Sequence, residues 1–575
     1  MLQKVIRRRP ISPDQGLEGA DLHPLLTRVY RARGVAADQL DLGLEHLLPP
    51  EGLLANDKAA GILADTLAAN ARVLVVGDFD ADGATSTTLA ISALRQFGLQ
   101  HVDYLVPNRF EYGYGLTPEI VELAKARHPD LIITVDNGIS SVEGVCVARE
   151  AGFSTLITDH HLPGRELPAA DVIVNPNQPG CQFPSKHLAG VGVIFYVMLA
   201  LRAELRRRGY FAQQPEPNLG QFADLVALGT VADVVPLDRN NRILVNAGLR
   251  RIRAGKARPG IQALLDVASR NIATVVASDL GYAVGPRINA AGRLDDISIG
   301  IECLLSKDLP RAAKLANQLH QLNQDRRVIE SDMQAEAIKA LGEINLNSPK
   351  ELPVAMTLYQ GGWHQGVIGI LASRIKDRIH RPTIAFADAD GEEVKGSARS
   401  IPGIHIRDIL DAVAARNPGL ITRFGGHAMA AGLTMARANY ERFAQAFVEE
   451  VERHATDVEL SAVIESDGEL AVQDFDLSLA KALRFAGPWG QHFPEPVFDG
   501  IFHLVSQRLV GEKHLKMSLF PADSSTLLDA IAFNVDPQQW PDDSVERVEV
   551  AYRLDVNEFR GKQTLQLVVE QLQPA

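Results

Sequence analysis

The segment Arg72-Val73-Leu74-Val75-Val76-Gly77-Asp78-Phe79-Asp80-Ala81-Asp82-Gly83 joins a short apolar run to three closely spaced acids. A continuous apolar run of this length, bounded by glycine, is typical of a strand buried on both faces of a parallel sheet. Three carboxylates at alternating positions repel one another strongly unless cations neutralise them. A helix cap explains one aspartate but not three, and a loop starting at Asp78 has Leu89 where an EF-hand requires glutamate. We therefore predict that Asp78, Asp80 and Asp82 bind metal.

The sequence on both sides of this segment alternates between helical and strand patterns. Helices are expected over 58–70, 85–97, 118–126 and 142–151, and strands over 72–76, 102–106, 131–135 and 153–157. Short continuous apolar strands in this alternation predict a parallel sheet with helices on both faces. Sheets of this kind bind ligands beyond the carboxyl ends of their strands. The acids after the strand over 72–76 lie at that edge.

Two later strands also end in acidic or imidazole side chains. Asp136 directly follows one of them, and Thr158-Asp159-His160-His161 ends another. Successive side chains of a strand point to opposite faces, so both histidines reach one site only if the chain turns there. Alone, this tetrapeptide would be an ordinary surface pair of histidines. Asp233 is the only charge in the apolar run 227–236. Taken individually, Asp136 and Asp233 are as compatible with a helix cap or a hydrogen-bonded buried acid as with a functional site.

The side chains collected in this way share one chemistry. All are carboxylates or imidazoles, and a set without cysteine suits Mn²⁺ or Mg²⁺ better than structural Zn²⁺. They exceed the needs of one ion, so we expect a pair of ions, the usual arrangement for in-line attack on a phosphodiester. The predicted ligands are Asp78, Asp80, Asp82, Asp136, His160 and Asp233. The sequence thus predicts metal-dependent phosphoester hydrolysis.

Composition narrows the classes of function. The chain has 575 residues, 46% of them hydrophobic, and a formal net charge of −13. This charge argues against non-specific electrostatic binding of duplex nucleic acid by the whole surface, but it permits a local basic channel. Three cysteines, Cys146, Cys181 and Cys303, show no metal-ligand spacing and suit a reducing cytoplasm. No apolar run is long enough for a membrane span, and the basic start at 1–10 lacks the apolar region of a secretory signal.

The pattern along the rest of the chain predicts further units. An N-terminal extension, with a helix over 22–33, is expected to pack on the next domain, and no glycine or proline interrupts the helical pattern over 311–341. Alternating apolar and polar residues near the C-terminus predict an OB-type β-barrel. The fold class is therefore α/β, with two α/β lobes joined by a long helix and followed by this barrel. The expected limits are 1–45 for the extension, 46–305 for the catalytic domain, 306–345 for the connecting helix, 346–455 for the second lobe and 456–575 for the barrel.

Loops with glycines, arginines and aromatic residues are candidates for contacting a nucleic-acid strand. An arginine beside aromatic rings suits a phosphate next to stacked bases, and glycines paired with serine and arginine make anion sites. The alternatives are aromatics folded into the core, helix caps and solvated arginines. The candidate contacts are Asn108, Arg109, Tyr114, Arg287, Asn289, Arg293, Trp363, Ser373, Arg374, Ser397, Arg399 and His427, and in the barrel Lys513, His514, Lys516, Arg560 and Lys562.

The order of these motifs resembles the DHH phosphoesterase superfamily and, within it, the RecJ family of bacterial exonucleases specific for single-stranded DNA. The motifs that carry the resemblance are GDFDADG, VPNRFEYGYGL, TVDNGIS, TDHH, ALGTVADVVPL and GPRINAAGRL, and the segments 363–369, 396–400 and 425–432 are similar to the DHH-associated domain. The resemblance spans nearly the whole chain. It implies metal ligands at Asp80, Asp82, Asp136, His160 and Asp233, with His161 at the scissile phosphate and Asp78 bound directly or through water.

This resemblance implies a 5′→3′ exonuclease that releases 5′-mononucleotides from single-stranded DNA in recombination and repair. The second lobe would bind the terminal phosphate, with Ser397 and Arg399 as the leading pair. A helicase and a single-strand-binding protein are the implied partners, and a monomer is expected because the long helix has only a partly apolar stripe. Two alternatives stay open: a phosphodiesterase for short oligonucleotides or cyclic dinucleotides, which needs no barrel, and a non-catalytic scaffold on single-stranded DNA.

Overall fold

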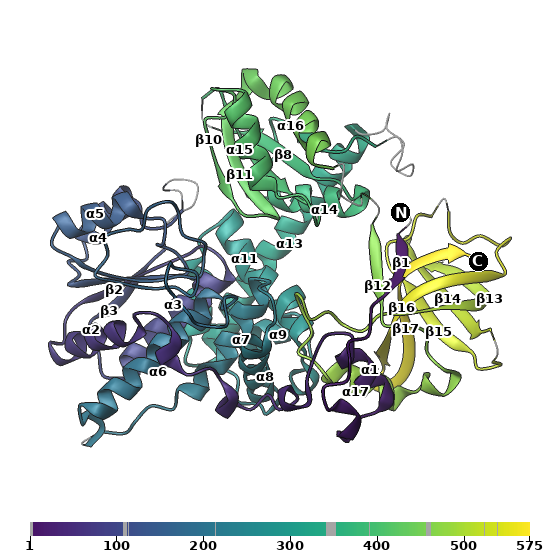
Figure 1. Cartoon of the computed structure of the whole chain (residues 1–575), viewed down its shortest axis with the longest axis horizontal. Helices are drawn as coiled ribbons and strands as arrows, with labels where there is room; N and C mark the ends of the chain where they lie inside the picture. The colour runs from purple at the N-terminus through teal and green to yellow at the C-terminus, as the bar shows by residue number, and fades with distance from the viewer. Residues whose placement is uncertain are drawn as a thin grey trace.

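The computed structural model describes residues 4–106, 112, 114–212, 214–340, 352–389, 391–455, 460, 462–522, 524–537 and 539–575. Two α/β lobes and a β-barrel surround a central group of helices (Figure 1), which confirms the fold class expected from the sequence. None of the helices in this described part has the length and hydropathy needed to cross a membrane. The exact domain limits stay predictions.

The first lobe is built on a parallel sheet with strand order β3-β2-β4-β5-β6. Its strands are β2 (Val73–Gly77), β3 (Val102–Leu105), β4 (Leu131–Val135), β5 (Ser154–Thr158) and β6 (Val172–Val174). Alternate residues face opposite layers, so that Val73 and Val75 pack with one group of helices and Leu74 and Val76 with another. The first group is α2 (Asn56–Ala68), α3 (Ala81–Gln96) and α6 (Gly190–Arg207), and the second is α4 (Pro118–Lys125) and α5 (Val142–Glu150). The sequence pattern did not predict β6 or α6.

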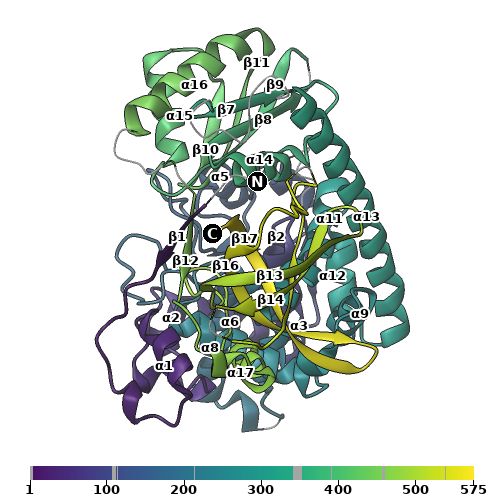
Figure 2. The same ribbon diagram turned by 90° about the vertical axis from the view of Figure 1, so that its right-hand side faces the viewer.

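A set of helices connects the first lobe to the second. Their bounds are α7 (Ala223–Ala232), α8 (Arg239–Arg253), α9 (Pro259–Val267), α10 (Ala277–Asp279), α11 (Gly285–Leu294), α12 (Ser298–Leu305) and α13 (Leu309–Ala340), with a π-helical turn, η8 (Leu280–Val284), between α10 and α11. Figure 2 shows α13 extending from beside α9 and α12 to the second lobe. The 32 residues of α13 therefore link the two α/β lobes, at about 1.5 Å of rise per residue.

The second lobe has a mixed sheet with strand order β10-β11-β9-β8-β7, in which only β7 and β8 are parallel. The strands are β7 (Met356–Tyr359), β8 (Thr383–Asp388), β9 (Glu393–Arg399), β10 (Arg423–Gly426) and β11 (Ala430–Ala436), and the helices are α14 (Ile368–Ile379), α15 (Ile406–Arg416) and α16 (Tyr440–His454). Phe386, Phe443 and Phe447 lie in its core. Residues at alternate positions of β9 face away from this core.

The C-terminal domain is a closed barrel with strand order β13-β14-β15-β17-β16. Its elements are α17 (Leu477–Phe485), β13 (Phe498–Val510), β14 (His514–Pro521), β15 (Leu528–Ala532), β16 (Arg547–Phe559) and β17 (Lys562–Pro574). Four of the strands lie where apolar and polar residues alternate in the sequence. The pattern did not predict β15, the shortest of them.

The first part of the N-terminal segment packs on the barrel domain, so the expectation that the segment packs on the next domain is wrong for that part and holds for residues 38–48, which contact α8. Strand β1 (Val5–Arg8) pairs in parallel with β12 (Val463–Ser466). After helix α1 (Pro24–Arg31), Arg33 forms a buried ion pair with Asp467, at 2.8 Å between Nη1 and Oδ1. A partner more than four hundred residues away gives no local signal in the sequence.

Candidate functional site

The chain turns directly after β5, which brings both histidines of the TDHH segment to one place. The buried carboxylate of Asp159 accepts hydrogen bonds from the backbone N–H groups of His160, at 2.7 Å, His161, at 3.1 Å, and Ile139, at 2.9 Å. It also lies 2.8 Å from Nδ1 of His161. The imidazole rings of His160 and His161 are 4.5 Å apart. Asp159 therefore positions this turn, a role that the sequence analysis did not assign to it.

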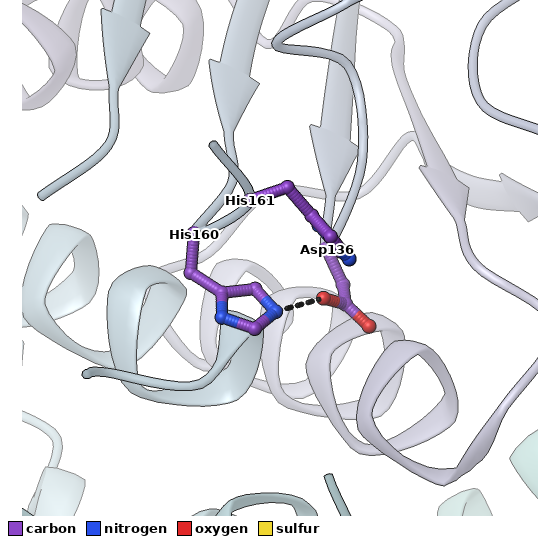
Figure 3. A group of neighbouring side chains, drawn as sticks. All are labelled: Asp136, His160 and His161. Atoms are coloured by element: carbon purple, nitrogen blue, oxygen red, sulfur yellow. Dashed lines mark ion pairs between the residues drawn. The ribbon is translucent and has the colours of Figure 1, made fainter. Parts of the chain in front are cut away.

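Asp136 and His160 face each other at the ends of neighbouring strands, as Figure 3 shows. Oδ1 of Asp136 lies 3.1 Å from Nε2 of His160. Asp136 has a φ of +62°, a left-handed conformation that few residues other than glycine adopt and that often marks functional sites. Both facing atoms are buried, and neither has a hydrogen-bond partner among the described residues. Buried polar atoms in this state are costly unless a ligand satisfies them.

The loop after β2 brings the other acids to the same edge of the sheet. Oδ1 of Asp80 caps α3, accepting from the backbone N–H groups of Asp82, at 2.9 Å, and Gly83, at 3.0 Å. The cap alternative therefore applies to one of the three acids, and it makes α3 begin four residues earlier than expected. Ligand atoms of Asp78, Asp80 and Asp136 lie within 4.8 Å of one another.

Asp82, Asp233 and His160 form a second group of possible ligands next to the group of Asp78, Asp80 and Asp136. Asp82 is fully buried and accepts hydrogen bonds from the backbone N–H groups of Gly190, at 2.6 Å, and Val191, at 3.0 Å. Asp233 follows α7 directly, and its Oδ2 lies 3.5 Å from Nε2 of His160. Ligand atoms of Asp82, His160 and Asp233 lie within 4.8 Å of one another. The two groups of ligand atoms thus fit the pair of divalent ions expected from the sequence.

Crowding of these acids changes their ionisation. Burial, with the charge of Asp233, raises the pKa of Asp82 to about 7, and burial, with the charge of Asp80, raises the pKa of Asp233 to about 8. Burial and the neighbouring carboxylates also raise the pKa of Asp136 well above its usual range. Divalent cations relieve such repulsion. The electrostatics therefore agree with the donor set in favouring a metal centre.

The pKa of His161 is raised, whereas that of His160 is lowered. Burial alone lowers the pKa of both, but the hydrogen bond and the charge of Asp159 raise the pKa of His161 to about 9. The hydroxyl of Tyr114 donates to the carbonyl oxygen of Asp136 at 3.1 Å and lies 3.2 Å from Nδ1 of His161. The ring of His427 stacks on that of His161, with centroids 5.9 Å apart. The second lobe thus reaches the histidine pair.

A groove of about 1140 Å³ separates the two α/β lobes next to this cluster. Its lining includes Phe79 and Tyr114 from the first lobe, Arg293 from α11, and Lys395, Ser397, Arg399, Arg423 and Phe424 from the second. The cationic side chains in the lining outnumber the acidic ones, which are Glu119 and Glu143. Despite the acidic total of the chain, the groove is locally basic and has aromatic rings on both sides.

Only some of the predicted strand contacts lie at the groove or the histidine pair. Tyr114, Arg293, Ser397 and Arg399 line the groove, and His427 stacks on His161. Nη1 of Arg293 donates to the carbonyl oxygen of Gly366 at 3.0 Å and so links the lobes. Nη1 of Arg399 donates to Oγ of Ser397 at 3.1 Å. Asn108 and Arg109 lie outside the described residues.

Other predicted contacts have structural partners instead. Trp363 is 7% exposed and packs in the core of the second lobe, where Nε1 donates to Glu336 at 2.8 Å. Nε of Arg374, one residue after Ser373 on α14, donates to Glu330 at 2.7 Å on α13. Nε of Arg287 donates to Nδ1 of His320 at 3.2 Å, also on α13. These side chains stabilise packing against α13, so a direct strand contact is wrong for Trp363.

Asn289 contacts the loop that carries Asp80 and Asp82 rather than the groove. Its Oδ1 accepts a hydrogen bond from the backbone N–H of Ala81 at 2.7 Å, between Asp80 and Asp82. On the same helix, a methyl group at Gly292 would lie 1.9 Å from the carbonyl oxygen of Phe79. The segment predicted as a phosphate-contact loop is helix α11, and it positions the acids of the cluster.

The sequence analysis missed several residues of this region. A methyl group at Gly190 would lie 2.6 Å from Oδ1 of Asp136, so only glycine lets α6 approach both Asp136 and Asp82. The signal was present as the small-residue run Ala189-Gly190-Val191-Gly192. Lys395 lies two residues before Ser397 on β9, and this period of two places it on the same face of the strand.

Comparison with known proteins finds the same division of the chain. Residues 72–230 match the DHH family, N-terminal domain, residues 352–453 match the DHHA1 domain, and residues 466–571 match the RecJ OB domain. The single-stranded-DNA-specific exonuclease RecJ of Dickeya dadantii (strain 3937) is 55% identical over 572 residues, which are 99% of this chain and 99% of that protein.

Solved structures give a consistent result. The crystal structure of RecJ in complex with Mn²⁺ from Thermus thermophilus is 28% identical and has a TM-score of 0.81, covering 100% of this chain and 80% of that chain. The crystal structure of RecJ in complex with Mg²⁺ from the same organism is 26% identical and has a TM-score of 0.76, covering 100% and 79%.

Proposed function

The chain belongs to the RecJ family of single-stranded-DNA-specific exonucleases, and from this premise we propose that it degrades single-stranded DNA from the 5′ end to 5′-mononucleotides, using Mn²⁺ or Mg²⁺. The observation that carries the proposal is the cluster of buried carboxylates and His160 at the edge of the parallel sheet, next to a basic groove between the lobes. A small-substrate phosphodiesterase needs neither this groove nor the barrel. A non-catalytic scaffold would not need the complete ligand set.

We assign the metal-binding role to six side chains. Asp78, Asp80 and Asp136 would hold one ion, and Asp82, His160 and Asp233 the other, and the contact of 3.1 Å between Asp136 and His160 joins the two groups. When bound, such ions make an attacking water more acidic and neutralise charge on the phosphate. The backbone N–H groups of Gly190 and Val191 hold Asp82 in place, and Asp159 orients the turn that carries His160.

His161 is the residue we assign to the scissile phosphate. Asp159 raises the pKa of His161 to about 9, so the imidazole of His161 carries a proton at neutral pH. A protonated imidazole donates strong hydrogen bonds to phosphate oxygens. Tyr114 from one side and His427 from the other limit its movement. The role of these residues is to fix the donor in place before the strand arrives, which lowers the entropic cost of reaching the transition state.

The far side of the groove has the features of a site for a terminal phosphate. Oγ of Ser397 and Nη2 of Arg399 lie 2.8 and 2.9 Å from the position that a methyl group would take at Gly369, in the first turn of α14. A guanidinium, a hydroxyl and the N-terminus of a helix together make a strong phosphate site. We infer that this pocket binds the 5′-phosphate, which would set the polarity of digestion.

Arg399→Gln is expected to raise KM for a 5′-phosphorylated strand by about tenfold or more, because a charge-assisted hydrogen bond to phosphate is lost. KM for the same strand with a 5′-hydroxyl should change by less than about twofold, since that strand never makes the contact. Steady-state kinetics on both strands measures the difference. Arg442→Gln, an exposed arginine on α16 of the same lobe, is the matched control. Equal effects on both strands would refute the assignment.

Digestion of single strands with one end blocked tests the activity and its direction. A strand with a blocked 3′ end should be degraded to mononucleotides, whereas a strand with a blocked 5′ end should persist. Release of products from the 3′ end would contradict the polarity, and cleavage of dinucleotides in preference to long strands would favour the small-substrate alternative. Binding without hydrolysis in Mn²⁺ and in Mg²⁺ would favour the scaffold.

The cellular setting is also part of this proposal. A strand-specific exonuclease needs its substrate unwound and unprotected, which supports a helicase and a single-strand-binding protein as partners in recombination and repair. We also propose a cytoplasmic location, since chromosomal DNA would supply the substrate. We propose a monomer, because both lobes that line the groove come from one chain.

A further inference from the structure

The face of the second lobe's sheet that lines the groove consists of rows of paired residues. Strands β9, β11 and β10 lie side by side as antiparallel neighbours, and residues directly opposite each other in such strands point to the same face. The first row pairs Arg399 with Ala430. It lies nearest to the histidine pair, because the turn between β10 and β11 carries His427, whose ring stacks on that of His161. The second row is Ser397, Gly432 and Gly425, and the third is Lys395, Thr434 and Arg423.

The second row leaves an open floor in the groove. A methyl group at Gly425 would have no atom of a more distant residue within 4 Å, and one at Gly432 would have only the carbonyl oxygen of Gly396, at 4.0 Å. Two residues of a strand span about 6.7 Å, so Lys395 and Arg399 are separated by about 13 Å along β9. A ligand can therefore lie against the sheet between those two side chains.

The third row carries two positive charges. Lys395 and Arg423 line the groove on either side of Thr434, and neither forms an ion pair with an acid in the part of the chain that the structure describes. By contrast, Arg437, directly after β11, pairs with Asp388 at 3.1 Å. Two strand spacings place the backbones of Lys395 and Arg423 about 10 Å apart, so both long side chains can reach one anion. Two cations that converge in this way suit a phosphate group.

This third row lies beyond the pocket assigned to the terminal phosphate. That pocket is formed where Ser397 and Arg399 approach Gly369. Along β9, Lys395 is one row farther from the histidine pair than Ser397. A strand with a single 5′-phosphate in the pocket therefore ends before the third row, whereas a strand with a further phosphate at its 5′ end extends into it.

We propose that the third row, Lys395, Thr434 and Arg423, binds a second phosphate group at the 5′ end of a strand, beyond the pocket for the terminal phosphate. Two sources share this chemistry: the outer phosphates of a 5′-triphosphate, and the phosphate of one extra nucleotide upstream of the cleaved bond. No bond changes at this subsite, which selects among 5′ ends by binding alone. The inference rests on the proposed function and deepens it by naming the class of 5′ end that the groove accepts.

The first test compares one strand carrying either a 5′-monophosphate or a 5′-triphosphate, with the full-length protein and Mn²⁺. The double variant Lys395→Gln/Arg423→Gln should raise KM for the triphosphate strand about tenfold more than KM for the monophosphate strand, because the lost charge-assisted hydrogen bonds reach only the longer 5′ end. The ratio of kcat between the two strands should stay at its wild-type value, since the contacts act on binding. Lys395→Arg, which keeps the charge, should keep the wild-type ratio of KM.

The second test identifies the first products released from the monophosphate strand by anion-exchange chromatography. When an extra nucleotide occupies the third row, the strand is cut one bond farther in, so wild type should release some dinucleotide and the double variant less. An effect confined to KM for the triphosphate strand would assign the subsite to polyphosphate ends. An effect confined to dinucleotide release would assign it to an upstream nucleotide.

Arg442→Gln, the exposed arginine on α16, is the control, and it should match wild type in both tests. A double variant with the wild-type ratio of KM and wild-type products would overturn this inference alone. Equal increases of KM for both strands, with unchanged products, would overturn it too, since the two cations would then contact the body of the strand. Wild-type protein that degrades neither strand would instead overturn the proposed function.

Discussion

Asp136→Asn is expected to reduce hydrolysis of single-stranded DNA by at least about a thousandfold, the effect of losing several kcal/mol of transition-state stabilisation. Asp136 lies within ligand distance of both groups of metal-binding side chains, because it neighbours Asp78 and Asp80 on one side and His160 on the other. Asparagine keeps the shape of the side chain and tolerates the left-handed backbone at this position, where φ is +62°. The loss would therefore reflect chemistry rather than misfolding.

The same variant offers a readout that does not depend on activity. Because burial and the neighbouring carboxylates hold the pKa of Asp136 high, removing its charge should raise the melting temperature of the metal-free protein by a few degrees. Strand binding, measured by fluorescence anisotropy, should persist because the groove is unchanged. Asp411→Asn, at an exposed position on α15, is the control. Hydrolysis at the wild-type rate in Asp136→Asn would remove Asp136 from the metal site.

Metal-free protein is expected to lose stability as the pH rises, and Mn²⁺ should restore it. Asp82 and Asp233 have pKa values of about 7 and about 8 in the folded chain, well above the value of about 4 for an unfolded aspartate. The folded state therefore holds these protons more tightly, so its stability is greatest below the unfolded pKa and is lost as the pH rises through 7 to 8. His161, with its pKa raised to about 9, acts in the same direction.

The size of this effect should be of the order of 7 kcal/mol between about pH 5 and pH 8 in a chelator. Melting temperature against pH, with and without Mn²⁺, measures it, and exonuclease activity should be lost in the chelator throughout. Asp82→Asn should flatten the metal-free curve, whereas Asp411→Asn should leave it unchanged. A melting temperature that is level across this range without metal, or that Mn²⁺ does not raise at the alkaline end, would contradict the metal assignment.

The gathering of acids and His160 at one edge of the sheet was predictable because its signals are local. Each of β2, β4 and β5 is a short apolar run, and the parallel arrangement of such runs places their carboxyl ends at one edge. The residues after those runs, from Asp78 to His160, therefore meet wherever the helices between them lie. Alternation of apolar runs, together with the chemistry of the side chains that follow, determined the first lobe and its ligands.

Which other polar side chains line the groove depends on packing between distant segments. Trp363, Arg287 and Arg374 stand in segments that suggest substrate contact, yet each has its partner on α13 or in the core. Arg399 and Ser397, the leading pair by family resemblance, do line the groove.

The α/β lobes, the barrel and the acids at the strand ends follow from local patterns, since periodicity and neighbouring residues encode strands and turns. The pairing of β1 with β12 and the close approach of α6 to Asp136 and Asp82 at Gly190 come from the folded chain alone. Those outcomes depend on packing between segments far apart in the chain. A local sequence pattern does not predict the free energy of such contacts, because it contains only one of the two partners.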